Sequence, residues 1–299
     1  RGVKLTVSVN VSSLHILSKG FIEQFENTLA RYPGINSGQL ELEILESSAL
    51  GDVNTIRQII KICQNALGVK VALDDFGTGY SSLTHLRSLS ADTIKIDKSF
   101  VRDMLDDPSD SAIIDGVIGL ADSFRHGIIA EGVETTEHGL MLLIMGCDKA
   151  QGYGIARPMP ADSLPQWLSD YVPNQAWIEC GSKSLTIKES KVALFRLITE
   201  QWKAKFVATI QSPPEDIEYW PIMDKEDCPC GAWITRAIQE QLFEREGLKN
   251  LAQAHDALHL LADTLRLQYL EGDLNSARES LPEIQAAFDN MNYALGICE

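Results

Sequence analysis

The stretch Val69-Lys-Val-Ala-Leu-Asp74-Asp75, followed at once by Phe76-Gly-Thr-Gly-Tyr80, decides the fold of this chain. A short apolar run that ends on charged residues and a glycine-containing turn is typical of a buried parallel strand. Five similar runs lie in the first half of the chain, at Leu5–Asn10, Leu40–Leu45, Thr93–Asp97, Gly127–Glu131 and Cys147–Gly152. Amphipathic helical patterns separate these runs, and strands that alternate with helices predict βαβ units in a parallel sheet.

The alternation stops near Pro160, and the remainder of the chain has helical patterns only. We expect an irregular stretch at 172–184, then helices at about 188–211, 231–246, 248–270 and 274–296. Gly247 and Gly272 are the expected breaks between the last three. The sequence therefore predicts an α/β domain over residues 1–180 and an all-α four-helix bundle over residues 181–299.

The composition is that of an ordinary globular protein and argues against two classes of partner. Of the 299 residues, 44% are hydrophobic and 23% charged, and no apolar run reaches the ~18 residues of a membrane span. A net charge of −16 disfavours binding to nucleic acid or to anionic lipid. The start of the chain has no signal-peptide pattern. We expect a cytoplasmic protein with free thiols and no membrane contact, although an upstream membrane or sensor domain stays open.

Polar side chains occupy the carboxyl-terminal part of nearly every predicted strand. They are Asn10, Glu43, Asp74, Asp75, Lys95, Glu131 and Gln151. Ionised groups in buried strands are costly unless they are paired or bind metal, and active sites of parallel barrels form at this rim. The oxygen ligands suit Mg²⁺ or Mn²⁺, and a pair of such ions serves in-line attack on a phosphate ester. Any one of these residues is explained equally well by a turn, but the whole set favours metal-dependent phosphate-ester chemistry.

The motifs around these residues resemble, in order and spacing, the EAL phosphodiesterase family. The resemblance covers residues 1 to about 170 and lies in Ser-Val-Asn10-Val-Ser, Leu-Glu43-Ile-Leu-Glu46-Ser, Asp74-Asp75-Phe-Gly-Thr-Gly-Tyr-Ser-Ser-Leu, Ile-Lys95-Ile-Asp, Glu131-Gly-Val-Glu134-Thr and Gln151-Gly-Tyr. It implies a TIM-like (β/α) barrel that hydrolyses cyclic di-GMP to linear pGpG with two Mg²⁺ or Mn²⁺ ions. It also implies a homodimer.

The resemblance further implies a role for each residue. The metal ligands would be Asn10, Glu43, Asp74, Asp75 and Glu131. The catalytic residues would be Lys95 beside the attacking water, Glu131 as ligand and base, and Asp75 near the second metal. Gln151 would orient the site. The supporting residues would be Glu46, Glu134, Gly77 and Thr78, with Glu46 holding the Asp75–Ser82 loop that couples dimerisation to metal binding in the family.

The six predicted strands fall short of the eight that a closed barrel needs. By resemblance, the first two strands are missing, together with the Glu-Ala-Leu tripeptide that supplies a further metal-ligating glutamate. The nearest string is Ser-Ala-Leu50, in a different motif. We interpret the chain as part of a longer enzyme, the alternative being a shortened domain that lacks one ligand. A catalytically inactive cyclic-di-GMP receptor and a signalling scaffold remain the competing functions.

Two motifs in the helical region suggest a second metal site. The motif Cys228-Pro-Cys230-Gly-Ala-Trp233 lies at the N-terminus of a predicted helix. In a later helix His255 and His259 are four residues apart, so both imidazoles lie on one face. Cysteine with histidine is a ligand set that favours zinc. A histidine pair alone is explained about as often by an ordinary core or surface role.

Taken together, these two motifs resemble the chemoreceptor zinc-binding (CZB) domain, a four-helix sensory bundle. That family has one more histidine, three residues before a tryptophan on the first helix. Here the tryptophan is Trp202, and Thr199 stands in the place of the histidine. The resemblance implies a regulatory zinc site of Cys228, His255 and His259, completed by water, by a nearby acid or, less favourably, by Cys230. A bundle that has lost its metal is the alternative.

Overall fold

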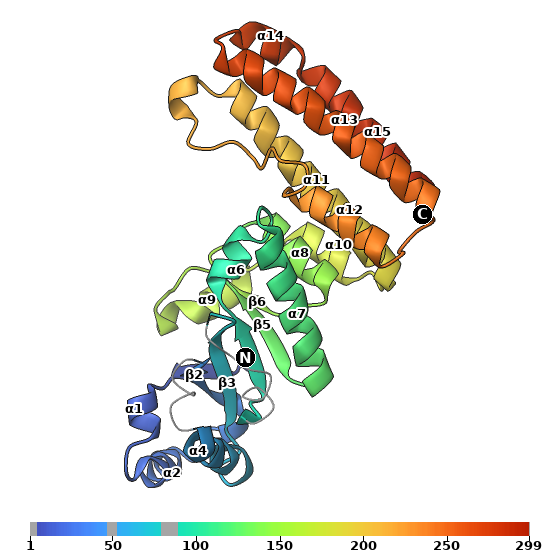
Figure 1. Ribbon diagram of the computed structural model, residues 1–299. Helices are drawn as coiled ribbons and strands as arrows, with labels where there is room; N and C mark the ends of the chain where they lie inside the picture. Colours follow the sequence, from blue (N-terminus) through green and yellow to red (C-terminus); the bar gives the residue numbers. More distant parts are fainter. Residues whose placement is uncertain (1–4, 47–52, 79–88, 299) are drawn as a thin grey trace. The chain divides into compact units, whose positions relative to one another are not determined.

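The computed structural model describes residues 5–46, 53–78 and 89–298 of the 299-residue chain. The chain divides into two compact units, which are described separately below (Figure 1). The first unit comprises residues 1–102 and 112–173, and the second comprises residues 103–111 and 174–299. None of the helices that the structure describes has both the length and the apolar character needed to cross a membrane.

A six-stranded parallel sheet forms the centre of the first unit. Its strands are β1 (Val7–Asn10), β2 (Leu40–Leu45), β3 (Lys70–Phe76), β4 (Thr93–Ile96), β5 (Gly127–Glu131) and β6 (Ala150–Gln151). Each strand pairs with the next one along the chain, so the sheet order is the chain order. This is the strand order of a barrel wall, and it confirms the predicted α/β fold with all six strands near their expected positions.

Helices connect the strands of the first unit, as the alternating pattern predicts. They are α1 (Ser13–Ile16), α2 (Phe21–Arg31), α4 (Val53–Asn65), α6 (Lys98–Asp103), α7 (Pro108–Phe124), α8 (Thr136–Met145) and α9 (Leu164–Asp170), with short 3₁₀ turns at Ser37–Gln39 and Ala161–Ser163. In α4 the fully buried residues Ile56, Ile60 and Cys63 recur at helical spacing, which places them on one face. The strands also contribute to this hydrophobic core, and Ile44 of β2 and Ile94 of β4 are fully buried.

The second unit is helical throughout its described secondary structure. Its elements are α10 (Gln175–Gly181), α11 (Ile187–Gln211), a 3₁₀ turn (Pro214–Asp216), α12 (Pro229–Gln239), α13 (Arg245–Leu270), α14 (Leu274–Glu279) and α15 (Leu281–Cys298). Helix α11 starts at a capping box in which Thr186 and Glu189 exchange hydrogen bonds. Phe195, Phe206 and Phe288 are fully buried in this unit. The long helices α13 and α15 run side by side (Figure 1).

Four predictions for the helical region were wrong. Gly247, expected to be a break between helices, lies inside α13. The stretch 172–184, expected to be irregular, contains α10. The helix expected at 231–246 ends at Gln239, where Leu242 N–H bonds the carbonyl of Ala237 and Gln241 adopts a left-handed φ of 52°. The helix expected at 274–296 is two helices, because Pro282, the second residue of α15, has no N–H to donate to the preceding turn and so cannot lie inside a continuous helix without loss of a hydrogen bond.

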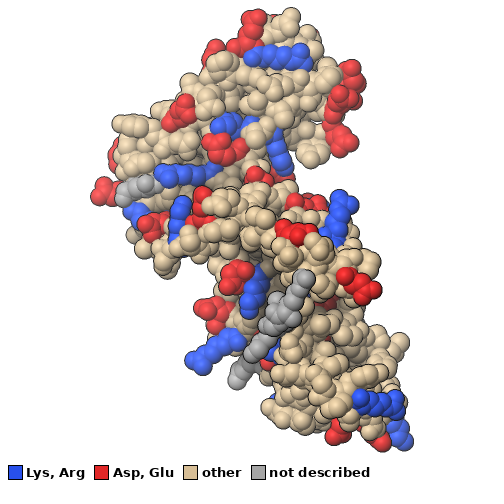
Figure 2. Space-filling view, turned by 180° about the vertical axis from the view of Figure 1, so that it is seen from behind, with Lys and Arg blue, Asp and Glu red and all other residues tan. Residues whose placement is uncertain are grey.

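Charged side chains of both signs cover the surface. On the face seen in Figure 2, red acidic and blue basic side chains are interspersed rather than gathered by sign. This face therefore has no single large acidic patch.

Candidate functional site

A bulge in β3 places the two consecutive aspartates. Successive residues of a regular strand point to opposite faces of the sheet, so Asp74 and Asp75 would normally diverge. Between the pairs Leu73–Ile94 and Phe76–Ile96, however, β3 carries one residue more than β4. Asp75 has a positive φ of 53° at this irregularity. The bulge thus turns both carboxylates toward one site, as bulges beside active sites often do.

Lys95 lies at the centre of the site, in β4. Its side chain is 3% exposed, and its Nζ lies 2.9 Å from Oε1 of Glu43 and 3.0 Å from Oδ1 of Asp74. It also forms an ion pair with Glu131, so three neighbouring strands each supply one carboxylate. Burial alone lowers the pKa of the Lys95 amine, but the bonds to Glu131, Glu43 and Asp74 outweigh this and raise it. Lys95 is therefore a cation at neutral pH.

The carboxylates of Asp74, Asp75 and Glu131 can share a metal ion. One oxygen from each lies within 4.8 Å of the others. Oδ1 of Asp74 is buried and is held by Lys95, whose Nζ lies 3.0 Å away. Burial raises the pKa of Glu131, and although the ion pair with Lys95 lowers it, the charges of Asp74 and Glu43 add to the rise and the pKa stays above its ordinary value. A crowded set of hard oxygen donors fits a divalent cation such as Mg²⁺ or Mn²⁺.

Gln151 holds Glu131 from the adjacent strand. Its amide Nε2 donates to Oε1 of Glu131 at 2.6 Å, and β5 and β6 place these two residues opposite each other. The backbone continues the contact, because Val133 N–H donates to the carbonyl of Gln151 at 3.1 Å. Gly152 permits this approach, since a Cβ there would lie 2.2 Å from the carbonyl oxygen of Val133.

We expect Gly152→Ala to destabilise the first unit and to separate Gln151 from Glu131. The added methyl group meets backbone atoms, which cannot turn aside as a flexible side chain does. Overpacking of this kind costs roughly 1–3 kcal/mol of unfolding free energy. Denaturant unfolding measures it, with Gly116→Ala in α7 as the control, because a Cβ at Gly116 has nothing within 4 Å. Equal stability of the two variants would contradict the expectation.

The other residues singled out in the sequence lie at varying distances from this centre. Asn10 lies on the exposed edge strand β1, opposite Glu43 in the register. Glu46 accepts the backbone N–H of Gly77 at 2.9 Å, and the Thr78 hydroxyl donates to the Asp75 carbonyl at 2.9 Å. The side chain of Glu134 is exposed. Ser82 and the string Ser-Ala-Leu50 lie outside the described residues.

Asp97 is a member of the site to which the sequence analysis assigned no role. It is buried, accepts the backbone N–H of Ser99 at 2.8 Å, and hydrogen-bonds to Asp75. Burial, the bond to Asp97 and the charge of Asp74 raise the pKa of Asp75. The signal was present in the sequence, because Asp97 follows Lys95 by two residues and therefore shares its side of the strand.

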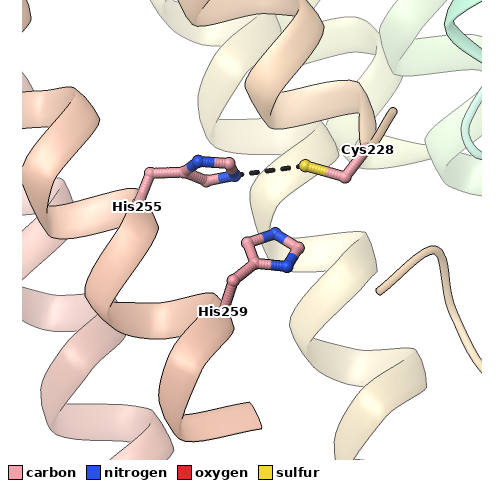
Figure 3. Close-up of side chains that lie close together, drawn as sticks. All are labelled: Cys228, His255 and His259. Atoms are coloured by element: carbon pink, nitrogen blue, oxygen red, sulfur yellow. Dashed lines mark hydrogen bonds between the residues drawn. The ribbon is translucent and has the colours of Figure 1, made fainter. Parts of the chain in front are cut away.

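A second cluster of potential metal ligands lies in the helical unit and consists of Cys228, His255 and His259 (Figure 3). Their ligand atoms lie within 4.8 Å of one another, and all three side chains are buried. Sγ of Cys228 is 3.1 Å from Nε2 of His255. Nδ1 of His259 lies 2.7 Å from the carbonyl of Met223. An Nδ1–H held by a carbonyl leaves Nε2 free to bind a metal, an arrangement usual for metal-binding histidines.

The local fold explains why Cys228 lies at this position. It is the N-cap of α12, and its sulfur accepts the backbone N–H of Gly231 at 3.2 Å. Gly231 is tightly enclosed, since a Cβ there would lie 1.9 Å from the carbonyl oxygen of Lys225. A hydrogen bond from Cys230 lowers the pKa of the Cys228 thiol, and both imidazoles lower it further. The lowered pKa favours the thiolate of Cys228, the form in which cysteine binds zinc.

Comparison with known proteins supports the family resemblance over the first unit. A model of the EAL domain family matches residues 1–158, which is more than half of the chain. The chain belongs to the EAL domain family. The match ends before the helical unit, so family membership says nothing of the Cys228 cluster.

Two named bacterial proteins are similar to the first part of this chain. The cyclic di-GMP phosphodiesterase PA2567 of Pseudomonas aeruginosa is 38% identical over 168 residues, which are 56% of this chain and 28% of that protein. The oxygen sensor protein DosP of Escherichia coli is 38% identical over 56% of this chain and 21% of its own length. This chain thus spans less than a third of either relative.

Two solved structures share the fold of the EAL unit. The EAL domain of DcpA from Mycobacterium smegmatis matches with a TM-score of 0.53 and 40% identity, over 56% of this chain and 75% of that one. The PaMucR phosphodiesterase in complex with c-di-GMP matches with a TM-score of 0.51 and 37% identity, over 53% of this chain and 64% of that one. The parallel sheet and its helices therefore have the architecture of known EAL domains.

Proposed function

We propose that the EAL unit hydrolyses cyclic di-GMP to linear pGpG with the aid of divalent cations, in bacterial second-messenger signalling. The observation that carries the proposal is the convergence of Asp74, Asp75 and Glu131 within 4.8 Å of one another beside Lys95. PaMucR, a phosphodiesterase solved with c-di-GMP, shares this fold at 37% identity.

The residues of the chain have separable tasks in this reaction. Bound Mg²⁺ or Mn²⁺ would neutralise charge on the phosphate and acidify a water molecule. Asp74, Asp75 and Glu131 would hold these ions, with Glu43 and Asn10 as further ligands from β2 and β1. Glu131, whose pKa is raised by burial, is suited to accept the proton of the attacking water. Lys95 would stabilise negative charge developing on the phosphate, and Gln151 would keep Glu131 in position.

The main competing function is a receptor that binds cyclic di-GMP without hydrolysing it. The specific observation in its favour is that Asn10, a predicted metal ligand, lies on the exposed strand β1, which pairs on one side only among the described residues. The loss of one metal ligand would lower the affinity for metal more than the affinity for cyclic di-GMP.

Turnover of cyclic di-GMP separates the two functions. The chain would be incubated with cyclic di-GMP and Mg²⁺ or Mn²⁺, beside a longer form that includes the protein's preceding segment, and pGpG would be followed by chromatography. We expect pGpG from the longer form. Binding of cyclic di-GMP by calorimetry without any pGpG from either form would instead establish a receptor.

For the helical unit we propose a zinc site at Cys228, His255 and His259 that regulates the EAL unit. The donor set of one thiolate and two imidazoles fits zinc, and the carbonyl of Met223 sets the ring of His259 as metal sites require. Trp202 packs against His259 with ring centroids 5.1 Å apart, which fixes the ring from a second side. Homodimerisation and a cytoplasmic location remain predictions from the sequence.

A further inference from the structure

The proposed zinc site provides three ligands where four are usual. Structural zinc is almost always held by four protein ligands in a tetrahedron. The cluster within 4.8 Å has Cys228, His255 and His259. Thr199 lies near by, but its hydroxyl is bonded to the carbonyl of Phe195 in the preceding helical turn, and a neutral hydroxyl is a poor zinc ligand. The fourth coordination position of the zinc ion therefore requires another donor.

Cys230 is the nearest further thiol to this cluster along the chain, two residues after Cys228. It is the second residue of α12 and is 4% exposed. Its sulfur lies 3.6 Å from Oγ1 of Thr199 on one side. On the other side it hydrogen-bonds to the sulfur of Cys228. A buried thiol that contacts both a ligand sulfur and Thr199 lies close enough to the cluster to be a candidate fourth ligand.

The charge of the buried cluster also favours a second thiolate. Cys228, His255 and His259 are each 4% exposed or less. Zinc held by one thiolate and two neutral imidazoles would carry one net positive charge away from water, which is costly. With Cys230 as a second thiolate, the four ligands and the metal are neutral together. The alternative donor is the carboxylate of Asp263, whose charge acts on His259.

We propose that Cys230 is the fourth zinc ligand, giving this chain a site of two cysteines and two histidines. The proposal rests on the zinc site proposed above. Because Cys230 lies outside the group of atoms within 4.8 Å of one another, its thiol turns from Thr199 toward the metal when zinc binds and loses its proton. The proton released adds to the pH dependence of zinc binding.

Cobalt substitution counts the bound sulfurs. The full chain would be loaded with Co²⁺ in place of zinc, and the near-ultraviolet band that arises from sulfur-to-cobalt charge transfer would be compared between variants. We expect Cys230→Ser to halve this band and to lower zinc affinity about 10- to 100-fold, by competition with a coloured chelator. Cys298→Ser, which removes another buried thiol of the same unit, leaves both values unchanged.

Two further variants keep the test decisive. Cys230→Ala repeats the experiment should the serine variant fold poorly, and Thr199→His added to Cys230→Ala restores zinc affinity by supplying a different fourth ligand. Equal band intensity and zinc affinity in the Cys230 variants and the wild type would overturn the proposal. A loss of affinity in Asp263→Asn with none in Cys230→Ser would overturn it in favour of the carboxylate. Failure of the wild type to bind Co²⁺ or zinc at all would instead remove the underlying zinc site.

Discussion

Replacing Lys95 by methionine lowers the turnover of cyclic di-GMP by about 10²–10³-fold, the loss typical of removing one electrostatic stabiliser from a hydrolytic site. Methionine keeps the length and apolar stem of lysine but not its charge. It leaves Glu43, Asp74 and Glu131 without the cation that now joins them. We expect kcat to fall while the affinity for cyclic di-GMP changes only a few-fold, because Lys95 acts on charge that develops during the reaction.

The measurement is the rate of pGpG formation at saturating substrate, in the form of the protein that proves active. Lys70→Met is the matched control. Lys70 lies in the same sheet as Lys95, but it is the first residue of β3 and therefore lies at the end of that strand opposite Asp74 and Asp75. It is exposed, and its replacement leaves turnover within about two-fold, as is usual for surface substitutions. A Lys95→Met protein with the turnover of the wild type would exclude a catalytic role for the amine.

Replacing His259 by alanine lowers zinc affinity by more than about 100-fold, a larger loss than the removal of an outer partner such as the Met223 carbonyl would give. Zinc that binds only the folded state stabilises it by RT ln(1 + [Zn]/Kd), about 4 kcal/mol when zinc is 1,000-fold above Kd. A chelator should therefore lower the unfolding temperature of the wild type and leave that of His259→Ala unchanged. His126→Ala, in the other unit, should respond to the chelator as the wild type does.

Acidification should act in the same direction as the chelator. Burial alone lowers the pKa of His259, but its bond to Cys228 and that thiolate's charge raise it above the ordinary value. A protonated imidazole cannot bind zinc, so affinity falls as the pH drops through this raised pKa and recovers above it. Zinc content measured by metal analysis across pH checks the sign. A zinc content that stays constant through this range would contradict the assignment of His259 as a ligand.

The sequence predicted those parts of the EAL unit that depend on local pattern. All six strands follow from short apolar runs between helical patterns, and Lys95 stood out as a charge inside the otherwise apolar Ile94-Lys-Ile96. The bulge at Asp74 and Asp75 was not predictable, because it arises from the register between β3 and β4 and not from either strand alone. The role of Asp97 was missed, although its spacing of two residues from Lys95 indicates that both side chains point to the same face of the sheet.

In the helical unit, the errors have two different causes. Pro282 was a readable signal for the break between α14 and α15, and the prediction of one helix gave it too little weight. The end of α12 had no such signal, since a glutamine occupies the left-handed position that usually belongs to glycine. The pairing of His255 and His259 followed from helical spacing. The backbone carbonyl of Met223 that orients His259 comes from a distant loop and leaves no trace in a local pattern.

The exposure of β1 has a practical consequence for handling the protein. Val7 and Val9 are 54% and 47% exposed, and the strand pairs only with β2 among the described residues. An apolar edge strand with unpaired backbone groups invites the edge of another molecule to continue the sheet. A preparation that contains only the residues of this chain is therefore prone to self-association and loss on storage. Replacing Val7 or Val9 by lysine would place a charge on this edge and oppose such self-association.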